Sequence, residues 1–460
     1  MKTDSRRLVL ATALAIACGS TSTDAQESIA LERFVDRLAS ENLLSMSVAV
    51  LRDGDPLLVK GYGFANREDG IPNTGTTRFR IGSLTKQFTA MAILILQEEG
   101  RISVDEAVET YLPDLPEHWK SITLHQLLTH TSGIMHSWAL PEFGANLAQA
   151  RPIGEIIELF YDEPLLFEPG EGFVYSGVGY FLLALLIEEV SGQTYESFLR
   201  TRVFDPLGMH DTGSDRPGSS ANGHARGYDV SDGIPVEIPP IHMPIFTGGG
   251  NLYSTAEDLV LWAEALTSRR LISPRSYAAL YTPETGDYAY GWFVRTEDGE
   301  RTIFHSGGLP GSTSFMIQYP DAGVTVITLS NLRGGMGDVT RAIAREVLEG
   351  PKDPVAPVEH VGTMASGTWR GSGSPPGGGY IELEYEVVSD GDSLAITVVT
   401  FGGLPLNEVR LEGSELRFWW SPERERLDCV LEYQDDGGYA GDCIGEFGGV
   451  ASVRMHPPRR

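Results

Sequence analysis

The feature that most constrains this chain is a small-residue turn that opens a long apolar run. Gly82 and Ser83 precede the run at 91–96, which contains no polar side chain, and Gly100 ends it. This order predicts a buried helix that begins near Ser83 and stops at Gly100. Lys86 lies three residues after Ser83, so both side chains face the same side of that helix.

A hydroxyl beside an amine at the start of a helix suits an activated serine nucleophile. Lys86 can take the proton of Ser83, and the N–H groups and positive dipole of the helix N-terminus favour a developing oxyanion. A helix cap next to a solvated lysine has the same spacing. The motif alone therefore leaves two interpretations, and the other motifs have to separate them.

Length and composition indicate a globular protein with more than one domain. The chain has 460 residues, which is longer than an ordinary single domain. Of these residues 41% are hydrophobic, enough to fill a core. The net charge of −28 argues against a nucleic-acid partner, because a phosphate-binding surface needs a basic patch. We expect the acidic surface to serve solubility.

The N-terminus is typical of a secretory signal peptide. A basic start that ends at Arg7 precedes an apolar run at 8–17, which is shorter than the roughly 20 residues that span a membrane. We assign residues 1–25 to the signal peptide and expect export to the periplasm or outside the cell. The segment 15–18 is also similar to a lipobox, in which Cys18 would carry a lipid anchor. The sequence leaves both possibilities open, cleavage of an ordinary signal peptide and lipidation of Cys18.

The cysteines and histidines do not suggest a metal site. Cys429 and Cys443 fall in neighbouring predicted strands, and an oxidising compartment would allow them to form a disulfide. The sequence contains neither H-E-x-x-H nor C-x-x-C. His125 and His130 lie near a glycine turn, and we expect His130 to hold the turn by hydrogen bonds. We therefore expect no metal.

The order of predicted elements favours an α+β fold. Runs of strands, rather than alternating strands and helices, predict an antiparallel sheet with helices packed on it and a helical insert. The stretch 213–240 has no periodicity and is predicted to be a long loop. The other predicted elements are a first helix at 28–42, hairpins at 45–62, 290–304 and 314–329, and a last helix at 338–348.

A second domain follows a Pro-rich linker at 351–357. Short strands separated by turn residues predict an all-β barrel or sandwich over 358–460. The segment 367–369, Gly-Thr-Trp, is similar to the opening of lipocalin-like barrels. This domain is either a lid or ligand-binding module, or a packing partner. The second is favoured, because no cluster of polar residues in it suggests chemistry.

Two later motifs complete a set that could act on a carbonyl. Tyr175 lies on a loop before a second apolar helix, and a tyrosine whose proton is loosened by a lysine can act as a general base. The segment 305–308 follows a predicted strand and contains two glycines. Glycines let a substrate come close and leave an N–H free for an oxyanion.

Together these motifs resemble the serine beta-lactamase and penicillin-binding protein superfamily. The likeness is strongest to the class C beta-lactamase-related branch, with its D-aminopeptidases, D-alanyl-D-alanine carboxypeptidases and esterases. It covers about residues 28–350, and implies a beta-lactamase/transpeptidase-like fold for a serine hydrolase domain at 26–350. The matching segments are 127–133 (LLTHTSG), 169–176 (PGEGFVYS), 206–209 (PLGM) and 305–311 (HSGGLPG).

The resemblance implies a role for each candidate residue. Ser83 would be acylated by the substrate, and Lys86 and Tyr175 would share its proton. The N–H groups of Ser83 and Gly308 would form the oxyanion hole. Water would be the second acceptor, so the reaction needs no cofactor. The substrate-holding strand, which replaces the family's Lys-Thr-Gly, would be His305, Ser306 and Gly307.

Two departures bear on the substrate. Gly177 stands where the family has an asparagine that helps hold the substrate. His305 replaces a lysine, and an unperturbed histidine, with a pKa of about 6.5, is mostly neutral at pH 7. Both changes favour an esterase or a peptidase-like hydrolase over an efficient beta-lactamase.

Two other functions could fit a chain of this kind. The alternative to an enzyme is a non-catalytic envelope binding protein that keeps the fold. Gly177 favours it, whereas the retained Ser83, Lys86 and Tyr175 argue against it. An α/β-hydrolase is excluded, because the sequence contains no G-x-S-x-G motif.

Overall fold

The structure of this protein is a computed structural model of two compact units, Met1–Pro351 and Lys352–Arg460. The predicted signal peptide at 1–25, with Cys18, and the predicted linker at 351–357 lie outside the described residues. Those are 27–350 and 364–456, apart from 41–43, 146, 217–222, 232–233, 298, 335, 365, 375–380, 391–392, 400–403, 413–414, 421–426, 434–438 and 446–449.

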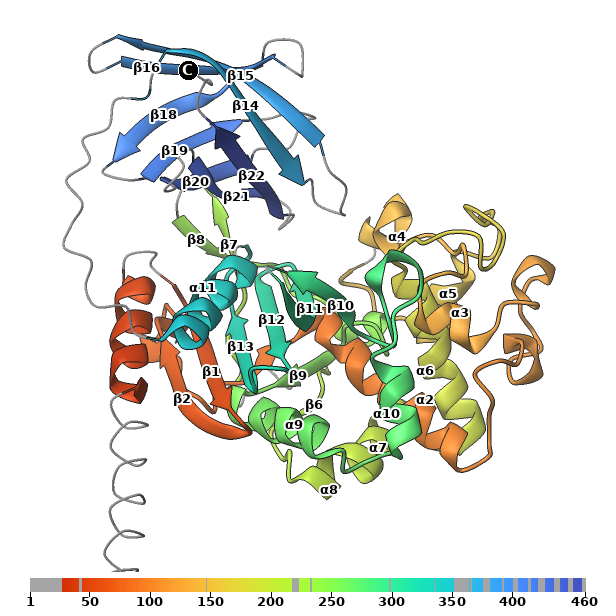
Figure 1. The fold of residues 1–460 in the computed structure, drawn as a ribbon. Coiled ribbons are helices and arrows are strands. Elements are labelled where there is room, and N and C mark those ends of the chain that lie inside the picture. Colours follow the sequence, from red (N-terminus) through yellow and green to blue (C-terminus); the bar gives the residue numbers. More distant parts are fainter. Residues whose placement is uncertain are drawn as a thin grey trace, which may run out of the picture. The chain divides into compact units, whose positions relative to one another are not determined.

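A six-stranded antiparallel sheet organises the first unit (Figure 1). Its order is β10-β11-β12-β13-β1-β2, so the first hairpin of the chain joins strands from the end of the unit, with Met46 opposite Ser330. This confirms the α+β prediction. The strands are β1 (Met46–Arg52), β2 (Asp55–Tyr62), β10 (Phe293–Glu297), β11 (Glu300–Leu309), β12 (Ser312–Tyr319) and β13 (Val324–Ser330).

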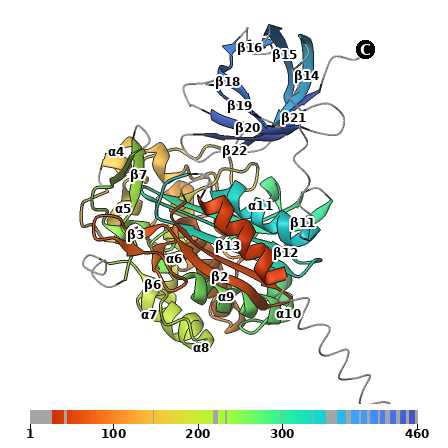
Figure 2. The same cartoon turned by 90° about the vertical axis from the view of Figure 1, so that its left-hand side faces the viewer.

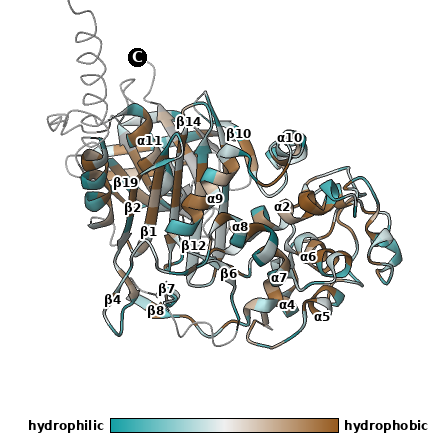
Figure 3. Ribbon diagram, turned by 90° about the horizontal axis from the view of Figure 1, so that it is seen from below, coloured by the Kyte–Doolittle hydropathy of each residue, from teal (hydrophilic) through white to brown (hydrophobic). Residues whose placement is uncertain are grey.

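Each face of the sheet is apolar and covered by helices. Side chains alternate along a strand, so Val48 and Val50 pack with α11 (Met336–Glu349) and with a helix over 27–40. Figure 2 shows these two helices on one face of the sheet. Ala49 and its neighbours on the other face join a larger core with the remaining helices. Figure 3 shows the hydrophobic residues along β1.

Helix α2 (Thr85–Glu98) is the centre of the helical part. Its residues are buried continuously from Thr85 to Leu96, and it ends before Gly100, which has a φ of 69°. It packs against α6 (Gly177–Ser191). Around this pair lie α3 (Leu124–Leu128), α4 (Pro141–Ala145), α5 (Ile153–Glu158), α7 (Tyr195–Leu199), α8 (Asp205–Leu207), α9 (Ala256–Ser268) and α10 (Pro274–Leu280).

The prediction of a long loop at 213–240 is wrong in part. This segment contains β6 (Gly213–Ser214) and a ribbon of β7 (Tyr228–Ser231) and β8 (Ile234–Glu237). Pro235 lies in the ribbon's second strand, and a proline weakens a strand signal in sequence. Tyr228 is buried and its hydroxyl contacts Glu68, a distant residue that local patterns cannot reveal.

The second unit is a nine-stranded antiparallel sheet, in the order β17-β16-β15-β14-β22-β21-β20-β19-β18. The edge strands β17 (Leu404–Pro405) and β18 (Asn407–Glu412) are separated by one residue, so the sheet must curl until its edges approach each other. This agrees with a small all-β domain. The other strands are β14 (Gly367–Ser374), β15 (Ile381–Asp390), β16 (Ser393–Val398), β19 (Glu415–Trp420), β20 (Leu427–Tyr433), β21 (Tyr439–Gly445) and β22 (Val450–His456).

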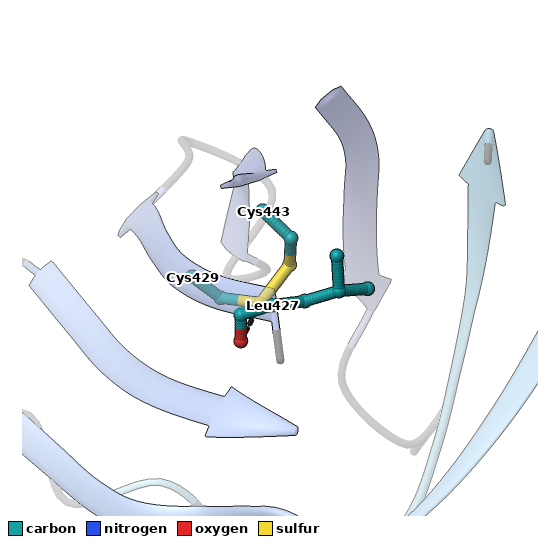
Figure 4. Close-up of a disulfide and its surroundings, with 3 residues drawn as sticks. All are labelled: Leu427, Cys429 and Cys443. Atoms are coloured by element: carbon teal, nitrogen blue, oxygen red, sulfur yellow. Dashed lines mark hydrogen bonds between the residues drawn. A yellow bond between two sulfur atoms is a disulfide. The ribbon is translucent and has the colours of Figure 1, made fainter. Parts of the chain in front are cut away.

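Cys429 and Cys443 form a disulfide inside this second unit (Figure 4). They are directly opposite each other in the register of β20 and β21, and both are buried. The pairing expected from the sequence is therefore present. The likeness of this unit to lipocalins stays a prediction.

Candidate active site

Ser83 lies in a short 3-10 turn, Gly82–Leu84, that leads directly into α2. Gly82 has a φ of 48°, in the left-handed region that glycine tolerates. A Cβ atom at this position would lie 2.9 Å from the backbone nitrogen of Gly308. The absence of a side chain therefore lets the serine turn sit directly against β11.

Lys86 is buried beside the serine, with 2% of its surface exposed. Its Nζ lies 3.2 Å from Oγ of Ser83 and donates to the carbonyl of Gly249 at 2.8 Å. Burial lowers the pKa of Lys86 to about 7, because a charged amine is costly away from water. A large fraction is therefore neutral at neutral pH and able to accept the serine proton. This environment contradicts the interpretation of a solvated lysine.

Tyr175 lies against the same two residues, on the loop that leads into α6. Its ring centroid is 4.9 Å from Nζ of Lys86. Burial raises the pKa of Tyr175, and the nearby Ser83 hydroxyl opposes the rise, although the two hydroxyls do not meet the geometry of a hydrogen bond. Tyr175 thus stays protonated at neutral pH. These two pKa shifts favour Lys86 over Tyr175 as a base, and favour Tyr175 as a proton donor.

His130 forms hydrogen bonds on both sides of Tyr175, in the loop 174–176 that we call the tyrosine loop. Its carbonyl accepts the N–H of Val174 at 3.0 Å, and its Nδ1 accepts the N–H of Ser176 at 3.1 Å. These two donors flank Tyr175 in the chain. His130 therefore forms hydrogen bonds as expected, but the two that the structure shows hold a loop some 45 residues away and not its own turn.

His305 is buried, with 1% of its surface exposed, and it faces Tyr175 at 6.0 Å between ring centroids. Its Nδ1 donates to the carbonyl of Ser306 at 2.5 Å, so its Nε2 accepts from the hydroxyl of Tyr288 at 2.9 Å. Burial lowers the pKa of His305 to about 3. This side chain is therefore neutral over the whole physiological range, more strictly than its residue type suggests.

Two aromatic residues complete the surroundings and were not predicted from the sequence. Tyr288 lies in the segment just before β10, and the ring of His136 stacks on Tyr175 at 5.5 Å and 23°. Burial lowers the pKa of His136 to about 4. Neither residue belongs to a motif, so only the fold reveals them. Among the described residues, no group of histidines, cysteines or acids is placed to hold a metal.

The end of β11 offers a free edge beside the serine. Strand β10 pairs with β11 only as far as Phe304, so from 305 to 309 that edge of β11 has no strand partner among the described residues. Gly307 is packed so tightly that a Cβ atom would lie 2.1 Å from the carbonyl of Ile81. Gly308 is exposed, and its N–H lies beside the Ser83 turn, as an oxyanion hole requires.

The space left by Gly177 is taken by a different residue. A Cβ atom at 177 would lie 2.9 Å from Oγ of Ser137, which belongs to the turn Ser137–Ala139. The next residue, Trp138, is 44% exposed and contacts Phe246. A hydroxyl and an exposed indole therefore stand on the side of the site where the family asparagine is missing.

The sequence model of the family described as Beta-lactamase matches residues 31–349. Penicillin-binding protein 4* of Bacillus subtilis is 30% identical over 324 residues, which are 65% of this chain and 71% of that protein. The protein flp of Staphylococcus aureus is 29% identical over 302 residues, 62% of this chain, and this chain spans only 59% of its length.

A solved structure extends the likeness to most of the chain. The octameric penicillin-binding protein homologue from Pyrococcus abyssi matches with a TM-score of 0.65 and 26% identity, over 92% of this chain and 99% of that one. Residues 1–351 are 351 of 460, or about 76% of the chain. A match over 92% therefore includes much of the second unit.

Proposed function

Because this chain belongs to the beta-lactamase family, we propose that it is an exported serine hydrolase that cleaves an uncharged ester or amide through an acyl-enzyme on Ser83. The observation that carries this proposal is the buried Lys86, with its Nζ 3.2 Å from Oγ of Ser83 and its pKa lowered to about 7. A neutral amine at this distance can activate a serine at neutral pH.

The acylation step follows from these positions. Lys86 accepts the Ser83 proton while Oγ attacks the substrate carbonyl, and the N–H groups of Ser83 and Gly308 stabilise the oxyanion. The carbon–oxygen or carbon–nitrogen bond then breaks, and Tyr175 gives its proton to the departing alcohol or amine. Lys86 returns a proton to Tyr175, which restores both groups. The acyl group is left on Ser83.

Deacylation repeats the sequence with water. Lys86, again neutral, takes a proton from water as its oxygen attacks the acyl carbon. The bond to Oγ of Ser83 breaks, and the serine recovers the proton from Lys86. The products are a free acid and the unmodified enzyme, with no further reactant.

The charge of the site supports an uncharged substrate. His305 stands where relatives have a lysine, and its buried ring is neutral because its pKa is lowered to about 3. It cannot attract a carboxylate by charge. Gly177 offers no side-chain amide, whereas the exposed indole of Trp138 offers an apolar surface to a substrate group.

A substrate panel on the purified protein tests this proposal. We expect kcat/KM for p-nitrophenyl butyrate, a neutral ester, to exceed that for nitrocefin, an anionic beta-lactam, by at least a hundredfold. The Ser83→Ala variant should lose both activities. Faster turnover of nitrocefin or of a D-Ala-D-Ala peptide would contradict the preference for an uncharged substrate.

A second candidate is a non-catalytic envelope binding protein, and Gly177 is the residue that favours it. It predicts no hydrolysis of any substrate in the panel. It also predicts binding to cell-wall fragments that is the same for the native protein and for Ser83→Ala. Turnover that depends on Ser83 excludes this candidate.

Export is supported by the disulfide between Cys429 and Cys443, because disulfides persist in oxidising compartments. Among the described residues, no helix is long and apolar enough to span a membrane. Fractionation of cells that express the full chain tests this part. The protein should be found in the periplasm, the culture fluid or, if Cys18 is lipidated, the membrane fraction. Recovery in the cytoplasm with reduced cysteines would contradict export.

A further inference from the structure

A hollow of about 600 Å³ lies in the first unit between the sheet and two helices. Its walls come from strands β1, β11, β12 and β13 and from helices α9 and α10. Nothing in the chemistry proposed for Ser83 uses it.

The hollow and the serine lie on the same face of the sheet but at opposite ends of β11. Ile303 lines the hollow. Because alternate residues of a strand lie on one face, His305 and Gly307 lie on the same face as Ile303. Gly307 contacts the serine turn. Arg301 also lines the hollow, and Gly308 lies seven positions further along the strand. At about 3.3 Å per residue, the two places are roughly 20 Å apart. The hollow is therefore a separate place in the molecule.

Two arginines in the wall of this hollow have no acidic partner among the residues that the structure describes. Arg269 follows the last turn of α9 and Arg301 lies near the start of β11. Both are exposed, and neither forms an ion pair with any residue that the structure describes. The chain carries 63 acidic and 35 basic residues, so two unpaired cations at one hollow are contrary to its overall charge.

Tyr281, in the same wall, has a buried hydroxyl. Its Oη lacks a hydrogen-bond partner among the described residues. Both Arg269 and Arg301 act on it, because they lower its pKa against the rise that burial causes. Arg301 also donates to the carbonyl of Tyr281 at 3.5 Å. A buried donor without a partner is costly, and an anion that accepts a hydrogen bond from this hydroxyl would remove that cost.

The remaining wall is largely apolar. Leu51, Leu266 and Val324 are buried side chains that line it. The acidic residue in the wall is Asp53, whose carboxylate lies against the backbone of Gly323. A ligand that fits this wall therefore combines an apolar body with one acidic group.

We propose that this hollow binds an organic anion, a carboxylate or sulfonate with an apolar body, whose acidic group lies between Arg269 and Arg301 and accepts the hydroxyl of Tyr281. The planar guanidinium groups supply paired donors for such an oxyanion. The apolar body covers the buried side chains of the wall.

Two fluorescent probes that differ only in charge test this site on the full chain. The anionic probe is 8-anilinonaphthalene-1-sulfonate, and the neutral one is N-phenyl-1-naphthylamine, which has the same ring system without the sulfonate. The variants are Arg269→Gln with Arg301→Gln, Tyr281→Phe, and Arg345→Gln as a matched control. Arg345 is an exposed arginine of α11 that does not line the hollow.

We expect the Kd of the sulfonate probe to rise at least tenfold in the double arginine variant and two- to fivefold in Tyr281→Phe. It should stay unchanged in Arg345→Gln, and the neutral probe should bind all four proteins equally. Equal binding of the sulfonate probe to the native protein and the double variant overturns the proposal. Equally weakened binding of both probes to the double variant also overturns it, because the substitutions would then have disrupted the hollow and not the recognition of charge.

Discussion

Burial of the Lys86 amine costs stability, but it also lowers the pKa of the amine so that it can act as a base. It is enclosed by α2, the tyrosine loop and the carbonyl of Gly249, and burial alone brings its pKa to about 7. A shift of this size comes from removing water, and no neighbouring cation is needed. The site thereby keeps a base that is available at neutral pH.

The pH dependence of the reaction follows from this value. The lowered pKa means that Lys86 is neutral above about pH 7 and protonated below it. We expect kcat/KM for p-nitrophenyl butyrate to fall about tenfold per unit below pH 7 and to be level from about pH 8 to 9. Tyr175, whose pKa is raised, and His305 and His136, with pKa values of about 3 and 4, add no transition between pH 5 and 9.

A pH–rate profile between pH 5 and 9 measures this directly. The control is Lys86→Arg, which stays protonated and should be inactive at every pH. A flat profile for the native protein, or a midpoint near the ordinary lysine pKa of about 10.4, would contradict the role of Lys86.

The contact between Gly177 and Ser137 predicts how an asparagine can be restored. In Gly177→Asn the new Cβ meets Oγ of Ser137 at 2.9 Å, so we expect a loss of about 1 kcal/mol in stability and little gain in penicillin binding. Adding Ser137→Ala removes that oxygen. The double variant should regain the stability and bind a fluorescent penicillin more tightly than either single variant.

Urea unfolding and fluorescence titration of the native protein, the two single variants and the double variant form a double-mutant cycle. Additive effects of the two substitutions, with no coupling, would show that Ser137 does not occupy the place of the missing side chain.

Residues that belong to a motif were predicted, however far apart they lie in the chain, whereas residues that the fold brings to the site without a motif were not. Ser83 and Lys86 were identified because the motifs around Tyr175 and His305 accompany their spacing. Ser137 and Tyr288 approach the site through segments that carry no motif. The neutral state of His305 depends on its burial, which its residue type cannot show.

At the scale of elements, β11 and the serine turn act as one unit. The turn at Gly82 fits only because neither it nor Gly307 has a side chain, and Ser314 donates from β12 to the carbonyl of Ile81. This close approach places an N–H of the strand beside the Ser83 turn. The proposed oxyanion hole thus depends on the packing of two elements far apart in the chain.

Two neighbouring glycines provide a matched test of this packing. A Cβ atom at Gly307 would meet the carbonyl of Ile81 at 2.1 Å, whereas at Gly308 nothing lies within 4 Å. We expect Gly307→Ala to lose about 2 kcal/mol of stability and at least a hundredfold in kcat/KM. Gly308→Ala should melt as the native protein does.

Thermal melting and ester hydrolysis of both variants check this expectation. Native stability and rate in Gly307→Ala would show that β11 and the turn are not in close contact at Gly307.

Most helices and strands could be predicted from the sequence, but the residues at which they begin and end were harder to predict. The hairpins and the long helices have clear periodicity, and they appear where the sequence indicates. The second strand of the 290–304 hairpin runs on to Leu309, because its pairing with β12 continues after β10 has ended. The ribbon at 228–237 was missed, because a short strand with a proline has little signal.

At the scale of the molecule, the two units have separate hydrophobic cores. The core of the second unit includes Trp369 and both disulfide cysteines, and it shares no residue with the cores around the sheet and α2. The family match also ends within the first unit, at residue 349. Each unit therefore has what it needs to fold alone.

Shortening the chain tests this independence. We expect a protein of residues 26–350 to melt cooperatively and to keep its kcat/KM for p-nitrophenyl butyrate within about twofold of the full chain. Circular dichroism and the ester assay measure both properties. A loss of activity greater than tenfold in a folded protein would show that the second unit acts in catalysis, as a lid would.

The acylation of Ser83 is the step on which the proposed function depends. Intact mass spectrometry after incubation with a fluorophosphonate measures it directly. The native protein should gain the mass of one adduct, which peptide mapping places on Ser83, and Ser83→Ala should gain none. Equal labelling of the two proteins, or an adduct on another residue, would contradict a serine hydrolase built around Ser83.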